Sequence, residues 1–210
     1  MKTNIWKCTG VMVLVGMLIA IATVAGATQD KGDKSRKDGI LLVAFGTSET
    51  NAKVSFDNIH RLAAKRFKSI PIRWAYTSDI IRRKLAKQGT EIDSPMVALA
   101  KMHDEGFTHV AVQSLHTIAG AEYDELKDTV SIFQKGSEAF DKIVLGRPLL
   151  WSFADMKQVV KAMLKEVPAS RKKNEIVVLM GHGSEHHPGD LAYTAAAWMF
   201  QQADPLVFLG

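Results

Sequence analysis

The sequence predicts an α/β protein with two similar lobes, each a parallel sheet flanked by helices. From Ile40 onward, short apolar runs rich in β-branched residues alternate with longer amphipathic segments. Runs that are apolar throughout are typical of strands that helices cover on both faces, as in parallel sheets. A basic turn at 168–175, "PASRKKNE", precedes a fresh apolar run, which indicates a second lobe.

Six strands and six helices are expected in this alternation. Ser94 and Pro95 mark the start of one helix, as a cap residue and a first-turn proline. The strands are predicted at 40–45, 72–77, 109–115, 142–146, 175–181 and 206–210, and the helices at 49–67, 79–87, 93–104, 121–134, 153–166 and 190–202.

The alternation divides the chain into lobes of unequal length. We expect an N-terminal lobe at 40–150, a crossover helix and linker at 151–174, and the start of a C-terminal lobe at 175–210. The last segment holds two strands and one helix, which is little for an independent sheet. The second lobe is therefore expected to be truncated at residue 210.

The N-terminus has the pattern of a secretory signal peptide at residues 1–27. A basic "MKTNIWK" precedes the apolar "VMVLVGMLIAIATV" and the small residues "AGA". An uncleaved membrane anchor is the alternative, although the apolar run is a little short for one. We expect an exported, periplasmic protein without a stable membrane anchor after cleavage, and a flexible linker at 28–39.

Composition excludes some classes of function. The only cysteine, Cys8, lies in the signal segment, so the mature chain forms no internal disulfide. The formal charge of +5 falls to +3 when Lys2 and Lys7 are removed, which is mild. The basic runs at 60–68 and 80–87 lack the interleaved aromatic residues of nucleic-acid sites, so no nucleic-acid partner is expected. Whether the protein forms a homo-oligomer is left open.

Three of the predicted strands are each followed by a segment that contains residue types able to bind a ligand or to catalyse a reaction. We call these the chemically loaded segments. In open α/β sheets, ligands bind beyond the carboxyl ends of the strands. The segments are "FGTSE" (45–49), "QSLHTIAGAEYDE" (113–125) and "MGHGSEHH" (180–187). Neither G-x-G-x-x-G nor G-x-x-x-x-G-K-[ST] occurs, so the nucleotide-binding fingerprints are absent.

The first segment supplies four candidate substrate-binding residues: Phe45, Gly46, Thr47 and Ser48. One interpretation is an ordinary helix N-cap. The other is a cradle of backbone N–H and hydroxyl groups that holds an anionic group at a helix N-terminus.

The second segment contains His116 and Glu122. His116 is either a strand-end histidine satisfied by a backbone hydrogen bond or a substrate-binding residue. Glu122 at a helix start is favourable by charge alone, because carboxylates stabilise the positive end of the helix dipole. It is also a candidate catalytic carboxylate that faces a cleft and removes a proton or handles a cation.

The third segment places His182 between two glycines after a buried strand. The flanking glycines, among them Gly183, allow a sharp turn and leave the imidazole accessible, so His182 is the candidate catalytic and metal-binding residue. His186 and His187 are expected to be loop or rim residues. The spacings do not match the H-E-x-x-H motif of zinc proteases, a Cys/His zinc site or the G-x-S-x-G motif of serine hydrolases. One imidazole with carboxylates suits transient binding of Co²⁺, Fe²⁺ or Ni²⁺.

These pieces together resemble the anaerobic sirohydrochlorin cobaltochelatase family of the class II chelatase superfamily. The resemblance implies a bilobal α/β fold with a tetrapyrrole cleft between the lobes. The residues that carry it are "AFGTSET" (44–50), "TSDIIRRKL" (77–85), "QSLHTIAGAEY" (113–123), "LGRPLL" (145–150) and "MGHGSEHH" (180–187).

The resemblance implies a chelatase that inserts Co²⁺, with Fe²⁺ as a second candidate, into sirohydrochlorin. His182 resembles the family's metal-binding and proton-accepting histidine, and Glu122 resembles its cleft carboxylate. Gly183 and His116 are expected to contact the substrate. The family also uses a second histidine in its C-terminal half, which is expected after residue 210.

The export signal departs from the family pattern, because cobalt insertion for corrinoid synthesis is cytosolic. Two alternatives therefore stay open beside a periplasmic chelatase. One is a non-catalytic periplasmic carrier of a tetrapyrrole such as haem, or of a metal, on the same fold. The other is a periplasmic binding protein for a different anion.

Overall fold

The computed structural model describes residues 35–184 and 186–210. They belong to one compact unit that begins at Lys34. The predicted signal peptide and most of the predicted linker lie outside the described residues.

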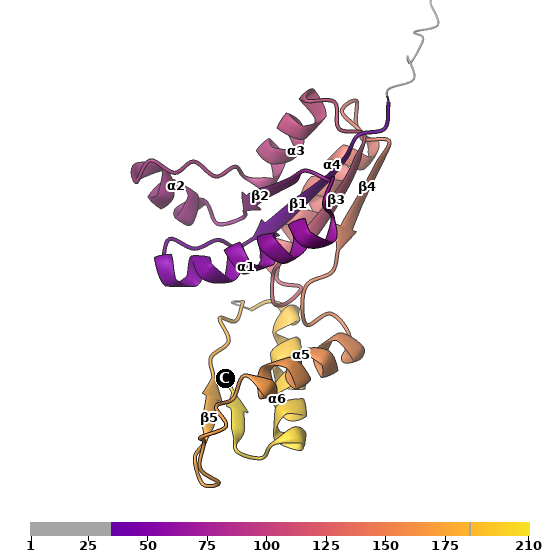
Figure 1. Cartoon of the computed structure of the whole chain (residues 1–210). Coiled ribbons are helices and arrows are strands. Elements are labelled where there is room, and N and C mark those ends of the chain that lie inside the picture. Colours follow the sequence, from indigo (N-terminus) through magenta and orange to yellow (C-terminus); the bar gives the residue numbers. More distant parts are fainter. Residues whose placement is uncertain (1–34, 185) are drawn as a thin grey trace, which may run out of the picture. The chain divides into compact units, whose positions relative to one another are not determined.

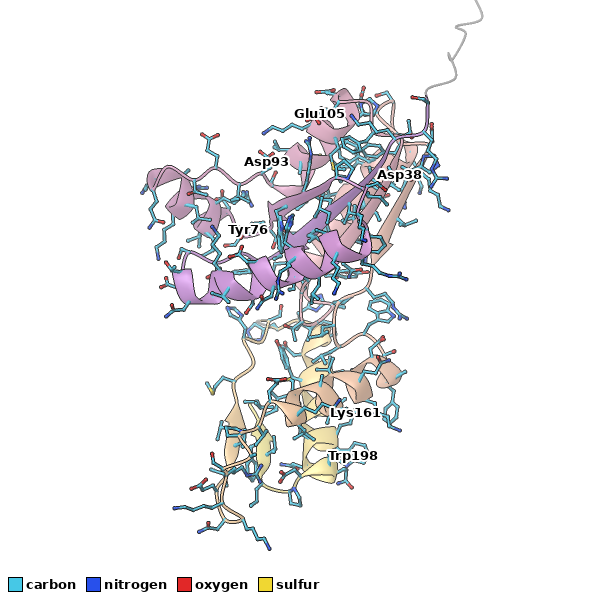
Figure 2. The ribbon with its side chains drawn as sticks, viewed as in Figure 1. Asp38, Tyr76, Asp93, Glu105, Lys161 and Trp198 are labelled. Carbon is cyan, nitrogen blue, oxygen red and sulfur yellow. The ribbon has the colours of Figure 1, made fainter. Side chains whose placement is uncertain are left out.

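The larger of the two sheets in this unit is parallel and has four strands, in the order β2-β1-β3-β4 (Figure 1). Its strands are β1 (Asp38–Ala44), β2 (Ile72–Tyr76), β3 (His109–Ser114) and β4 (Lys142–Gly146). All three pairs of neighbouring strands are parallel. Asp38 and Tyr76 therefore mark opposite edges of the sheet, the amino and the carboxyl edge (Figure 2).

Alternation of side chains along β1 divides the core between the two faces of the sheet. Leu41 and Val43 are fully buried in the main hydrophobic cluster. The helices α3 (Pro95–Asp104) and α4 (Ala121–Lys135) supply much of the rest of that cluster, including Leu99. The predicted start of α3 is confirmed, since the Ser94 hydroxyl accepts a hydrogen bond from the Val97 N–H.

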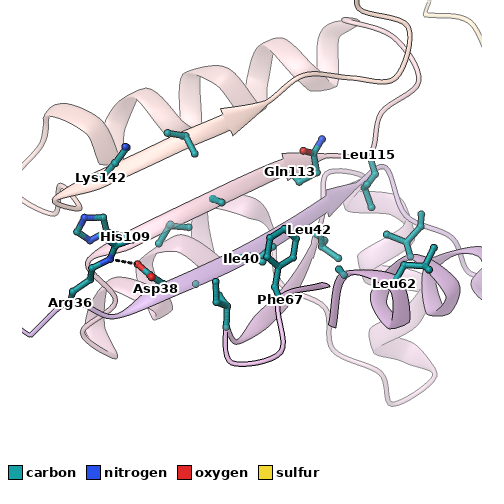
Figure 3. A pocket seen from close by; sticks show the side chains of 17 residues that line it. Arg36, Asp38, Ile40, Leu42, Leu62, Phe67, His109, Gln113, Leu115 and Lys142 are labelled. Atoms are coloured by element: carbon teal, nitrogen blue, oxygen red, sulfur yellow. Dashed lines mark hydrogen bonds and ion pairs between the residues drawn. The ribbon is translucent and has the colours of Figure 1, made fainter. Parts of the chain in front are cut away.

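The opposite face carries Ile40 and Leu42 and lies against α1 (Thr50–Arg66). No residue of α1 is buried. An apolar groove with a volume of about 570 Å³ separates α1 from the sheet (Figure 3). On this face Ala111 and Val144 are exposed, so the described residues cover β3 and β4 from one side only.

A shorter helix, α2 (Asp79–Lys87), follows β2. The Ser78 hydroxyl caps it by accepting a hydrogen bond from the Ile81 N–H. The Arg82 guanidinium donates to the carbonyl oxygens of Tyr76 and Thr77 at 2.6 and 2.7 Å. These contacts hold the turn after β2 at the carboxyl edge of the sheet.

The second sheet consists of β5 (Val177–Leu179) and β6 (Val207–Leu209), which pair in parallel. The remaining elements around it are α5 (Phe153–Lys165), a 3₁₀ turn η1 (Pro188–Asp190) and α6 (Leu191–Ala203). Their hydrophobic cluster includes Ile118 and Leu150, which belong to loops that follow β3 and β4. Loops of the larger sheet thus contribute to the core of the smaller one.

The predicted α/β class is confirmed, although several element boundaries differ from the prediction by one or two residues. β1 begins at Asp38, inside the predicted linker, because Asp38 already pairs with His109 of β3. β5 is shorter than the predicted 175–181, because its only partner among the described residues, β6, spans three residues. None of the helices in the described ranges is long and apolar enough to cross a membrane.

Burial predicts a large stability difference between two leucines. Leu41 is 0% exposed, whereas Leu62 on α1 is 63% exposed. Leu41→Ala should lower the free energy of unfolding by about 2–5 kcal/mol, because it leaves a cavity in a packed core. Leu62→Ala should change it by only about 0.5 kcal/mol. Urea unfolding followed by circular dichroism measures both, and equal losses would contradict this description of the core.

Candidate functional site

A cavity of about 200 Å³ lies at the carboxyl edge of the larger sheet. Residues from all three of the chemically loaded segments line it. It brings together six of the eight predicted site residues: Phe45, Gly46, His116, Glu122, His182 and Gly183.

Thr47 and Ser48 are not among the residues that line this cavity. The Thr47 hydroxyl instead accepts a hydrogen bond from the Glu49 N–H at 3.0 Å. Glu49 is the N-cap residue of α1, so neither hydroxyl caps that helix as the first interpretation of "FGTSE" expected. Thr47 therefore shapes the turn that leads into α1.

Gly46 lets the chain turn sharply after β1. Its φ is 109°, a region that favours glycine. A Cβ atom at this position would lie 2.6 Å from the Tyr76 ring. The turn leaves the Phe45 side chain 40% exposed, and the Phe45 ring lies 5.7 Å from the His182 ring, centroid to centroid.

His116 is buried, and hydroxyl groups contact both of its ring nitrogens. Nδ1 lies 2.9 Å from the Ser114 hydroxyl, and Nε2 lies 3.2 Å from the Thr77 hydroxyl. Burial lowers the pKa of the imidazole, and the nearby Glu122 carboxylate opposes this shift only in part. Of the two interpretations, the satisfied strand-end histidine fits better, although hydroxyls rather than backbone groups satisfy it. His116 joins the ends of β2 and β3 while it lines the cavity.

Glu122 lies in the first turn of α4, which begins after the N-cap residue Gly120. The segment between His116 and Gly120 carries the chain from β3 to α4, so the topology fixes Glu122 near the strand end. The side chain is half-buried at the cavity. Glu122 and His182 line the same cavity.

His182 follows β5 and is exposed to solvent. Its Nδ1 lies 3.1 Å from the carbonyl oxygen of Gly183. A carbonyl oxygen only accepts hydrogen bonds, so in the neutral ring Nδ1 carries the proton and Nε2 keeps its lone pair. That nitrogen can accept a proton or bind a divalent metal.

Phe56, Ser184 and Tyr193 are among the cavity residues that were not predicted from the sequence. Phe56 lies on α1 and stacks on Trp74 with ring centroids 5.3 Å apart. Tyr193 lies in the first turn of α6. A sequence signal was available for Phe56 and Tyr193. Both are aromatic residues in the first two turns of a helix that follows one of the chemically loaded segments.

No metal cluster is preformed in the described part of the chain. No three side chains of His, Cys, Asp or Glu gather there closely enough to hold an ion. His182 is thus a single imidazole in a cavity that the carboxylate residue Glu122 also lines. The larger groove under α1 has a mostly apolar lining and contains none of the predicted site residues (Figure 3).

The lowered pKa of His116 predicts a specific dependence of stability on pH. Because the folded state binds this proton less readily than the unfolded state, the stabilisation is complete above the unfolded pKa of about 6.5. It is lost as the pH falls from there through the lower pKa of the folded state. Urea unfolding between pH 8 and 5 should show a smaller loss in His116→Asn than in the unaltered protein. Equal slopes would contradict a buried neutral imidazole.

Comparison with known proteins identifies the family of the chain. Residues 38–210 match the family described as Cobalt chelatase (CbiK). The "Sirohydrochlorin cobaltochelatase CbiKC" of Nitratidesulfovibrio vulgaris (strain Hildenborough) is 42% identical over 174 residues, which cover 83% of this chain and 61% of that relative. The "Sirohydrochlorin cobaltochelatase" of Salmonella typhimurium (strain LT2) is 40% identical over 157 residues, 72% of this chain and 56% of that relative. The matched region spans less than two thirds of either relative. By the match over 38–210, the chain belongs to the cobalt chelatase (CbiK) family.

Proposed function

We propose that this protein inserts Co²⁺ into sirohydrochlorin. The observation that carries the proposal is the cavity at the strand ends, where Phe45, Glu122 and His182 line one space. Membership of the cobalt chelatase family and the names of the two relatives support the same reaction. The residue roles below are part of the proposal.

His182 is the proposed metal ligand and proton acceptor. Metal insertion removes both inner pyrrole protons while Co²⁺ loses water and passes to the ring nitrogens. A neutral imidazole suits this exchange, because it binds a first-row metal ion and also accepts a proton near neutral pH. Its exposed Nε2 lone pair is consistent with receiving the ion from solvent.

Glu122 is the proposed cleft carboxylate. It lines the same cavity as His182, where a carboxylate can take up a released pyrrole proton or hold the hydrated metal ion. The exposed ring of Phe45 offers an apolar surface for a planar macrocycle in the same cavity.

Fe²⁺ as a second metal and haem as a bound ligand remain predictions. Neither relative is named for haem carriage.

Loss of the His182 imidazole should abolish turnover. His182→Ala should reduce Co²⁺ insertion to background, and Glu122→Gln should lower it by about a hundredfold, within the range of proton-transfer catalysts. Visible absorption of sirohydrochlorin mixed with Co²⁺ follows the reaction. His109→Ala is the matched control, because His109 lies at the amino end of β3 and away from the cavity.

Two results would contradict the assignment. Full activity of His182→Ala would refute its role as ligand and proton acceptor. Sirohydrochlorin binding without turnover in the unaltered protein, accompanied by a Soret band on titration with haem, would favour the carrier alternative instead.

We also propose that the protein is exported to the periplasm. The basic, apolar and small-residue regions of residues 1–27 support this proposal. N-terminal sequencing of protein recovered from the periplasmic fraction should begin at Thr28. Leu14→Arg should prevent export, because a charge interrupts the apolar region. Recovery from the cytosol alone, with Met1 retained, would contradict the proposal.

A further inference from the structure

His187 makes two directional hydrogen bonds that fix its tautomer. Its Nδ1 accepts a hydrogen bond from the Gly189 N–H at 3.0 Å and so caps the 3₁₀ turn η1. The proton of the neutral ring therefore lies on Nε2. Nε2 donates to a carboxylate oxygen of Asp124 at 3.2 Å, across a sequence separation of 63 residues. His187 lies in a loop, as the sequence predicted, and its side chain is 22% exposed.

Asp124 is well placed to accept this bond. It lies in the first turn of α4, two residues after Glu122. Its other carboxylate oxygen lies 2.7 Å from the Lys127 ammonium group, one turn along the helix. This second contact orients the carboxylate toward His187. The hydrogen bonds from Lys127 and His187 also lower the pKa of Asp124, which keeps the carboxylate charged.

The backbone around His187 packs closely against the segment before α4. We call residues 181–184 and 186–190 the histidine loop. A Cβ atom on Gly189 would lie 2.2 Å from the carbonyl oxygen of Ala119, and one on Gly120 would lie 3.2 Å from the Ser184 hydroxyl. Within the loop, the Ser184 N–H donates to Asp190 at 2.8 Å. His186 has a φ of 56°, which costs energy for a residue other than glycine, so surrounding contacts must hold this conformation.

We propose that the His187–Asp124 hydrogen bond holds the histidine loop against α4, and that His187 is thereby a positioning residue for His182. The proposal rests on the proposed function for its catalytic consequence. Glu122 lies two residues before one end of the bond, and His182 lies five residues before the other. Without the bond, the imidazole and the carboxylate lose their fixed relative position at the cavity.

Two variants separate this bond from the local cap. In His187→Asn, the shorter side chain still accepts a hydrogen bond from the Gly189 N–H but no longer reaches Asp124. Asp124→Ala removes the same bond without changing any residue of the histidine loop. Asp124→Asn keeps an oxygen acceptor for the Nε2–H group. Asp128→Ala, an exposed acidic residue of the same helix, is the matched control.

Kinetics with Co²⁺ and sirohydrochlorin give the first readout. His187→Asn and Asp124→Ala should each lower kcat about tenfold with little change in KM, since misplaced groups act on the chemical step. The double variant should be no slower than either single variant, and Asp124→Asn and Asp128→Ala should match the unaltered protein. Multiplying effects in the double variant, or unchanged kcat with a lower melting temperature only, would overturn the proposal.

Amide hydrogen exchange gives a second readout that needs no turnover. The Ser184 amide should exchange faster in His187→Asn and Asp124→Ala than in the unaltered protein, and at the same rate in Asp124→Asn and Asp128→Ala. An unchanged rate in Asp124→Ala would overturn the proposal. If the unaltered chain inserts no cobalt, the proposed function fails, and this comparison alone decides whether the bond holds the loop.

Discussion

The parallel pairing of β1 with β3 is the constraint on which the rest of the site depends. Val43 pairs with Ser114, so the residues that follow these strands, Phe45 and His116, emerge at one edge of the sheet. An antiparallel arrangement would send them to opposite edges. Burial of β1 fixes this register, because a shift by one residue would move Leu41 from the face that α3 and α4 cover to the face that lies against α1. The chemistry at the carboxyl edge thus follows from packing within the sheet.

The smaller sheet depends on the same edge. Ile118, in the loop after β3, is part of the hydrophobic cluster around α6, and the histidine loop contacts the segment that leads to α4. Packing and hydrogen bonding therefore both hold the histidine loop near the segment that leads to α4. If His182 binds the metal as proposed, the histidine loop gains from such support, since a preorganised site loses less entropy when it binds and reacts. Ile118 belongs to the hydrophobic cluster around α6 and also lines the cavity, so packing of the two sheets forms part of the cavity.

The sequence predicted the elements well because their signals are local. Apolar runs, cap residues and prolines report on strands and helices without tertiary information, as Ser94 does for α3. Strand lengths depend on partners, so the extent of β5 was overestimated. At the candidate site, six of the eight predicted residues line one cavity, whereas Thr47 and Ser48 do not. The bond from His187 to Asp124 spans 63 residues, and no local pattern encodes such a pairing.

A crystal structure of the protein soaked with Co²⁺, with anomalous data at the cobalt edge, tests the central claim most directly. We predict cobalt on Nε2 of His182, at about 2 Å as for imidazole ligands of other first-row metals. The ion should face the cavity that Phe45 and Glu122 line. Cobalt bound through His186 or His187, with His182 unliganded, would contradict the account.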